Sequence, residues 1–141
     1  MRVVADTNTV VSAFLWGGTP ADVLIAAREQ RHSLFTSATL IAELEDVLAR
    51  EKFAKRITQV GSTVADLLAG YRALAQLVRT AVIAPVCRDP DDDHVLACAL
   101  AADATLIVTR DKDLLTLDPF RSIRVLSARA ALALLAEPQG Y

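Results

Sequence analysis

Acidic residues are placed along this sequence so that four separate segments could each contribute a carboxylate to one site. Asp6 and Asp111 each follow a short apolar run, Glu43 lies in a helical pattern between them, and further acids cluster at residues 89–93. Oxygen ligands without His or Cys select Mg²⁺ or Mn²⁺, which keep bound waters and bind substrate phosphate. Because such ions polarise phosphoryl oxygens and lower the pKa of bound water, the pattern predicts phosphodiester hydrolysis.

The acid run at residues 89–93 also has a simpler explanation. Carboxylates in the first turn of a helix cap its amides and complement its dipole, which would account for one or two of them. Asp89, Asp91, Asp92 and Asp93 exceed that need, because four acids within five residues repel one another unless a cation intervenes. We therefore keep both interpretations of the run.

Periodicity leaves the roles of the other acids open. Glu43 and Glu45 lie on opposite borders of the apolar stripe of one predicted helix, and their spacing does not choose between them. Asp111 and Asp113 could cap the short helix that follows them. The joint occurrence is more informative, because Asp6 and Asp111 both follow buried β-runs, and such strand ends share one edge of a parallel sheet.

Strands and helices alternate among the elements that would position these acids. The sequence predicts strands at residues 2–5, 33–36, 105–108 and 123–126, with a candidate third strand at 81–83. It predicts helices at 8–15, 19–30, 37–48, 52–57, 61–78, 89–102 and 112–117, and one that begins at 127. This alternation implies an α/β fold with a mostly parallel sheet covered on both faces. Residues 1–141 are expected to form a single domain.

Composition excludes several classes of protein. No apolar stretch is long enough for a membrane span, and the first apolar run breaks too early for a signal peptide. Cys87 and Cys98 lack zinc-binding spacing, so we expect free thiols in a cytoplasmic protein. A net charge of −2 argues against a basic protein that wraps nucleic acid, but not against an enzyme that holds phosphate through metal ions.

One short segment is basic and comprises Arg50, Lys52, Lys55 and Arg56. It is most simply a solvated face, with RNA-backbone contact as the alternative.

Four segments in this order and spacing resemble the PIN domain family. They are VVADTN at 3–8, LIAEL at 40–44, DPDDDHVLA at 89–97 and LIVTRDKDLL at 106–115. Ser12 and the WGG sequence at 16–18 extend the resemblance, which spans almost the whole chain. The branch that the chain resembles most comprises toxin components of toxin–antitoxin systems, relatives of VapC-type ribonucleases.

The resemblance implies a three-layer α/β/α sandwich that cleaves single-stranded or structured RNA with Mg²⁺ or Mn²⁺. The family's acids map onto Asp6, Glu43, the Asp92 or Asp93 position, and Asp111. Asp93 has the spacing found in VapC-type toxins, whereas Asp92 is the equivalent in the nearer branch. The other residues implied to support the site through hydrogen bonds or at its margin are Thr7, Asn8, Thr109 and Asp113. The resemblance also implies a homodimer, and an antitoxin that covers the acidic groove.

Two other functions compete with a ribonuclease. A phosphatase or phosphotransferase could use Asp6 as a covalent nucleophile, but Asn8 stands where its second carboxylate, the general acid, is expected. The second alternative is a non-catalytic module whose acidic groove binds a basic partner. His94 is expected on a helix surface, with metal or RNA contact as the alternative, and His32 in a loop without a role.

Overall fold

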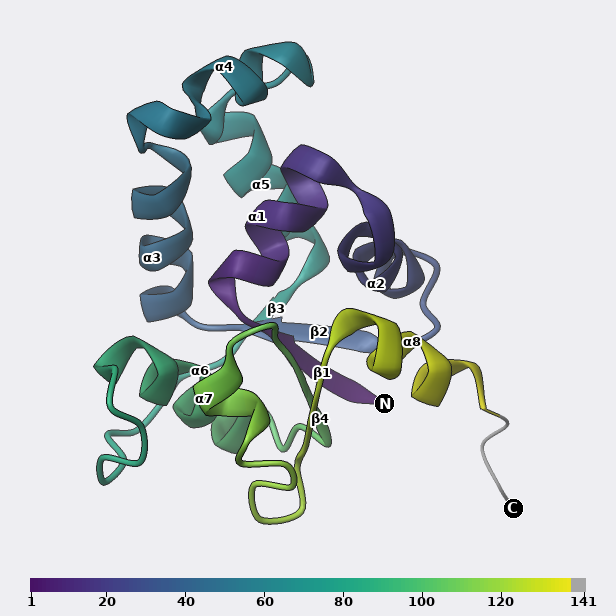
Figure 1. Ribbon diagram of the computed structural model, residues 1–141, viewed down its shortest axis with the longest axis vertical. Coiled ribbons are helices and arrows are strands. Elements are labelled where there is room, and N and C mark those ends of the chain that lie inside the picture. The colour runs from purple at the N-terminus through teal and green to yellow at the C-terminus, as the bar shows by residue number, and fades with distance from the viewer. Residues whose placement is uncertain (138–141) are drawn as a thin grey trace.

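A five-stranded parallel sheet organises the protein, whose computed structural model describes residues 1–137 (Figure 1). Its strands lie in the order β3-β2-β1-β4-β5. They are β1 (Arg2–Ala5), β2 (Ser33–Thr36), β3 (Gln76–Leu77), β4 (Leu106–Val108) and β5 (Arg124–Leu126). The order reverses at β1, so a topological switch point lies between β1 and β4. Ligands bind in open α/β sheets outside the strand ends at such a point.

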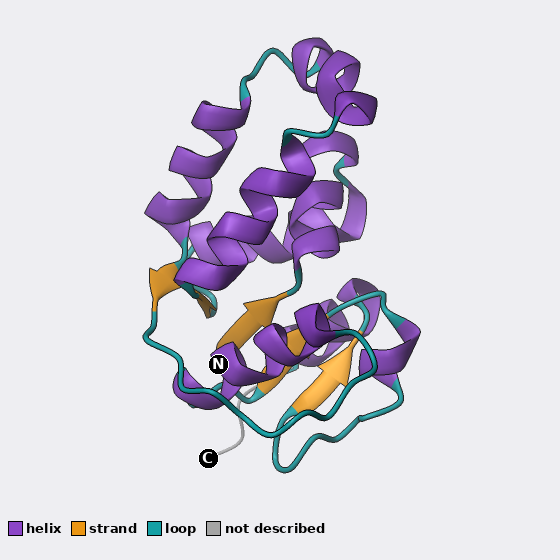
Figure 2. Ribbon diagram, turned by 90° about the vertical axis from the view of Figure 1, so that its left-hand side faces the viewer, coloured by secondary structure: helices purple, strands orange, loops and turns teal. Residues whose placement is uncertain are grey.

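Helices cover both faces of the sheet (Figure 2). Successive strand residues point to opposite faces, so one strand packs against helices on both sides. In β1, Val3 packs with α2 (Gly18–Arg28) and α8 (Ala128–Ala136), and Ala5 packs with α1 (Thr7–Trp16). Val4 points the other way, into a cluster with α6 (Pro90–Ala101) and α7 (Lys112–Leu115). The predicted three-layer α/β/α fold with a parallel sheet is confirmed.

Three helices form an extension on the α1 side of the sheet. α3 (Ala38–Leu48) leads away from the end of β2, α4 (Glu51–Gln59) lies at the far end, and α5 (Val64–Leu74) returns toward the sheet (Figure 1). Their buried residues Leu44, Ile57 and Leu68 belong to one cluster with Val10 of α1. This packing fixes α3, and with it Glu43, relative to the carboxyl end of β1.

The predicted strand at residues 81–83 is wrong, and so is the predicted extent of the helix before it. α5 ends at Leu74, and the chain pairs with β2 at once through β3. The Val78 N–H donates to the Thr36 carbonyl at 2.8 Å, so Val78 belongs to this edge and not to a helix. Val82 is fully exposed. Its β-branched side chain has no sheet to pack against, which is why propensity misled the prediction.

Several helix starts also differ from those predicted, and at two of them the capping residue explains the difference. Asp6 caps α1, so this helix begins at Thr7, one residue earlier than expected. α2 begins at Gly18, and Gly17 is its N-cap, so Thr19 is not the cap. The φ angles of Gly17 (73°) and Gly18 (67°) are readily adopted only by glycine. Within residues 1–137 no single helix is long and apolar enough to cross a membrane. Only α1 and α2 taken together, bent by 97°, meet that criterion of length and composition.

Candidate metal centre

Asp6 sits at the end of β1 with both carboxylate oxygens engaged. Oδ1 accepts a hydrogen bond from the Thr9 N–H at 2.9 Å, which caps α1, and Oδ2 accepts one from the Thr109 hydroxyl beyond β4. The residue is only 6% exposed. Burial raises its pKa, and the bonds from Thr109 and Thr9 partly offset that rise. A charged group here is therefore costly and well oriented.

Asp111 reaches the same edge of the sheet from β4. The Asp6 N–H donates to the Val108 carbonyl at 3.1 Å, so β1 and β4 stay paired up to the point where the acids emerge. The Thr109 hydroxyl accepts from the Asp111 N–H at 3.0 Å while it donates to Asp6. Thr109 therefore links the two acids directly. Asp111 Oδ1 also caps α7, as expected from sequence, by accepting from the Asp113 N–H at 2.8 Å.

Asp92, Asp111 and Asp113 form a compact group of carboxylates. One oxygen of each lies within 4.8 Å of the others, which is close enough to share a cation. Burial raises the pKa of Asp92 to about 6, and the neighbouring charge of Asp111 adds to the rise. The group joins the first turn of α6 to the first turn of α7.

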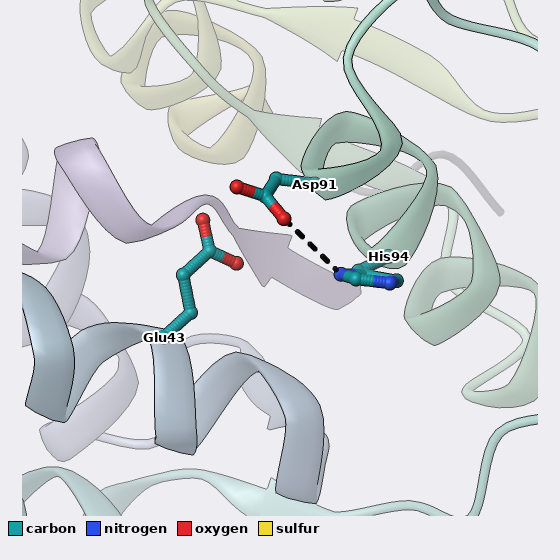
Figure 3. A group of neighbouring side chains, drawn as sticks. All are labelled: Glu43, Asp91 and His94. Carbon is teal, nitrogen blue, oxygen red and sulfur yellow. Dashed lines mark ion pairs between the residues drawn. The ribbon is translucent and has the colours of Figure 1, made fainter.

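Glu43 belongs to a second group of possible ligands. It extends from α3 toward Asp91 and His94 at the start of α6 (Figure 3), and one ligand atom from each of the three lies within 4.8 Å of the others. His94 Nδ1 lies 3.8 Å from Asp91 Oδ1. Burial, followed by the charge of Asp91, raises the pKa of Glu43 to about 7. Among the described residues its buried Oε2 atom has no hydrogen-bond partner.

Asp6 connects these two groups electrostatically, although it belongs to neither. Its charge contributes to the raised pKa of Glu43 and to that of Asp92, and Asp111 in turn contributes to the raised pKa of Asp6. A partnerless buried carboxylate oxygen amid mutually repelling acids is unfavourable in its ionised form unless a cation is bound. The donor set is mainly carboxylate oxygen, so these residues fit a hard divalent ion such as Mg²⁺ or Mn²⁺.

Asp92 and Asp93, which the sequence could not separate, occupy different surroundings. Asp93 Oδ1 accepts from the Cys87 N–H at 2.9 Å and from the Val86 N–H at 3.2 Å. These bonds hold the pKa of Asp93 below its usual value. Asp93 thus fastens the loop before α6, whereas Asp92 faces Asp111 and Asp113.

The remaining supporting candidates lie on the first turn of α1. Thr7 is buried, and its hydroxyl lowers the pKa of Glu43 slightly against the larger effect of burial. Asn8 is exposed and lines an open groove of about 550 Å³ beside the acids. The loop residue His32 is buried, with Nε2 2.8 Å from the Val23 carbonyl, so it has a structural contact that sequence did not suggest.

Two residues near the site were not among the candidate ligands or supporting residues from sequence. Asp91 belonged to the acid run but matched no family position, and it lies beside Glu43 and His94. Arg110 lies in the groove, where its Nη1 donates to Ser12 Oγ at 3.0 Å. The only signal for Arg110 was its place between two site residues, because its contact with Ser12 joins residues 98 positions apart.

Comparisons with known proteins agree with this fold. A family model described as PIN domain matches residues 2–113. A chain in the crystal structure of VapBC2 from Rickettsia felis, bound to a DNA fragment from their promoter, is similar with a TM-score of 0.60. The two are 14% identical, over 89% of this chain and 97% of that chain. FitAcB from Neisseria gonorrhoeae gives a TM-score of 0.50 and 18% identity, over 90% of this chain and 98% of that chain. None of the curated proteins matches the chain.

Proposed function

The chain belongs to the PIN domain family, and on that premise we propose that it is a metal-dependent endoribonuclease, the toxin of a toxin–antitoxin pair. The observation that supports this proposal most strongly is a pair of acid groups, one around Glu43 and one around Asp111, that the charge of Asp6 links. In the first of them the buried Oε2 of Glu43 has no hydrogen-bond partner among the described residues. Such a donor set suits an ion that binds phosphate. RNA phosphodiesters in the cytoplasm are the proposed substrate.

The proposed metal ligands are Asp6, Glu43, Asp92 and Asp111. An oxygen of Asp113 lies within 4.8 Å of oxygens of Asp92 and Asp111 and could join them. A bound Mg²⁺ or Mn²⁺ would polarise the phosphoryl oxygen and lower the pKa of the attacking water. The protein's part is to hold the ligands in place. Thr109 bonds the Asp6 carboxylate and the Asp111 backbone N–H together, so the Asp6 side chain is oriented before an ion binds.

The toxin assignment and its partners rest on the resemblance of the sequence to VapC-type toxins. The likeness of the fold to VapBC2 and FitAcB agrees with it. An antitoxin that covers the acidic edge would silence the enzyme, because binding and catalysis would share one surface. A homodimer is also expected, and sedimentation of the purified chain measures it.

Substitution of Asp6 tests the enzymatic proposal. Asp6→Asn should lower cleavage of an RNA oligonucleotide about 100-fold or more, because it deletes a ligand charge. The fold should persist, since Asn also caps helices. EDTA should abolish cleavage by the parent, and Mn²⁺ should restore it.

Asp103→Asn is the matched control. Asp103 lies before the amino end of β4, whereas the site acids lie at the carboxyl ends of the strands. Its φ of 53° is one that Asn also adopts. It should cleave like the parent. If Asp6→Asn also cleaved like the parent, the site assignment would be wrong. If the parent bound Mn²⁺ but cleaved no RNA, the protein would be an acidic-groove binding module.

A further inference from the structure

An open groove adjoins the candidate metal centre and differs from it in chemistry. Its lining includes Asn8, Ser12, Trp16, Phe53, Arg110 and Asp111. Asp111 belongs to both, so a ligand in the groove would extend directly into the acid cluster. The rest of the lining is aromatic, neutral or basic.

Trp16 presents an exposed aromatic surface in this groove. It is 58% exposed, although large aromatic side chains are usually mostly buried. Phe53 contacts it edge-on, with ring centroids 5.9 Å apart at an interplanar angle of 69°. The Arg56 guanidinium lies 5.9 Å from the centre of the indole, and Arg56 Nε donates to the Leu15 carbonyl at 2.6 Å. The indole is therefore supported by its neighbours and still accessible.

Arg110 lines the groove, and two further basic residues contact its aromatic lining, although the whole chain has a net charge of −2. Arg110 donates to Ser12, and no acid within residues 1–137 forms an ion pair with it. Lys52 Nζ lies 5.0 Å from the centre of the Phe53 ring, and Arg56 lies against Trp16. An anionic ligand fits these charges, whereas a basic peptide would be repelled. Part of the basic segment thus borders a groove that leads to the acids.

We propose that this groove is a nucleotide subsite, in which an unpaired base stacks on Trp16 and the adjoining phosphate contacts Arg110. The inference rests on the proposed ribonuclease function, and of single-stranded and structured RNA it selects the single strand. Bases in a duplex are already stacked on one another, so their faces are closed to an indole. Aromatic side chains and basic residues are the usual combination for binding single strands.

The chain's single tryptophan makes the subsite measurable. In the Asp6→Asn background, which prevents cleavage, an unstructured RNA oligonucleotide should quench Trp16 emission on titration. The same sequence as a duplex, and a backbone of equal length without bases, should quench much less. Anisotropy of end-labelled RNA should show binding at least about fivefold weaker for Trp16→Leu and largely kept for Trp16→Phe.

Arg110→Ala should weaken RNA binding. It should also lower the steepness with which the logarithm of the binding constant falls with the logarithm of salt concentration by about 1. Arg129→Ala, an exposed arginine on α8 outside the groove, is the matched control and should bind RNA like its parent. Thermal melts establish that each variant is folded.

The subsite would be overturned if Trp16→Leu bound RNA as tightly as its parent, or if bound RNA left Trp16 emission unchanged. Emission that depended on protein concentration without RNA would assign the groove to a contact between two copies, which also overturns it. If the active parent still cleaved RNA in these cases, the proposed function would stand. If the parent neither bound nor cleaved RNA, both proposals would fail.

Discussion

The surroundings of Glu43 differ from those of an ordinary surface glutamate. Its Oε2 atom is buried and lacks a hydrogen-bond partner among the described residues. Burial and the nearby Asp91 raise its pKa to about 7. Without a cation, the folded protein therefore holds the Glu43 proton more tightly than the unfolded chain does.

This shift predicts a pH dependence of stability that Glu43→Gln removes. The pKa of Glu43 rises from 4.5 to about 7 on folding, so its favourable contribution is complete at low pH and is lost as pH rises through that window. In EDTA the free energy of unfolding of the parent should fall between pH 5 and pH 8 more than that of Glu43→Gln. Urea unfolding at the two pH values measures it.

Glu45→Gln provides the control on the same helix. Glu45 is exposed, two residues further along α3, and should leave the pH dependence of the parent unchanged. Equal pH dependence in the parent, Glu43→Gln and Glu45→Gln would contradict the raised pKa of Glu43. Sequence periodicity placed both residues at borders of the apolar stripe. The family resemblance selected Glu43, and the structure separates the two because Glu43 lies beside Asp91 and His94 of α6.

In the first turn of α6, two adjacent acids have different roles. Asp92 faces Asp111 and Asp113, whereas Asp93 binds the backbone amides of Val86 and Cys87. Two neighbours on a helix point about 100° apart, so one can face the site while the other holds the preceding loop.

Separate effects are therefore expected from Asp92→Asn and Asp93→Asn. Asp92→Asn should weaken Mn²⁺ binding and RNA cleavage at least about tenfold, because it removes a proposed ligand charge. Asp93→Asn should keep most of both and lower the melting temperature by about 2–4 °C, through weaker bonds to the loop amides. Calorimetric Mn²⁺ titration and thermal melts measure the two effects. The reverse assignment of effects would make Asp93 the ligand.

Buried elements were easier to predict from sequence than exposed ones. Residues 2–5 and 33–36 were predicted at their observed bounds, since an apolar run between polar residues determines a buried strand. The placement of Asp6 and Asp111 at one edge followed from that. The prediction failed at residues 81–83, where apolar residues lie in an exposed loop, and at Val78, where pairing with β2 replaces the helix. Such tertiary pairing leaves no local signal.

At the scale of the whole molecule, the sheet gathers negative charge at one edge and places a groove with positive charge beside it. The acids come from segments more than 100 residues apart, as the bond from Thr109 to Asp6 illustrates. The acids could be assigned to this edge from sequence. The groove could not, because Trp16, Phe53 and Arg110 meet only after α1, α4 and β4 have packed.

Metal binding should therefore stabilise the whole domain. The pKa values of Glu43 and Asp92 are raised to about 7 and about 6, so both acids cost stability when ionised above those values, and a cation should relieve that cost. Mg²⁺ at ten times its Kd should add about 1.4 kcal/mol, or about 3–6 °C in melting temperature, at pH 7.5. The gain should be smaller at pH 5 and in Asp6→Asn. A parent that melted identically with Mg²⁺ and with EDTA at pH 7.5 would argue that the acids are ordinary structural groups.

The central claim is that Asp6, Glu43, Asp92 and Asp111 bind a divalent ion together. Crystals soaked in Mn²⁺ and measured near the manganese absorption edge test it most directly, because the anomalous signal locates the ion without reference to activity. We predict a peak bounded by these four carboxylates, with Asp93 still bonded to the loop amides. An anomalous map with no peak at this edge of the sheet, or with Mn²⁺ only on exposed acids elsewhere, would contradict the account.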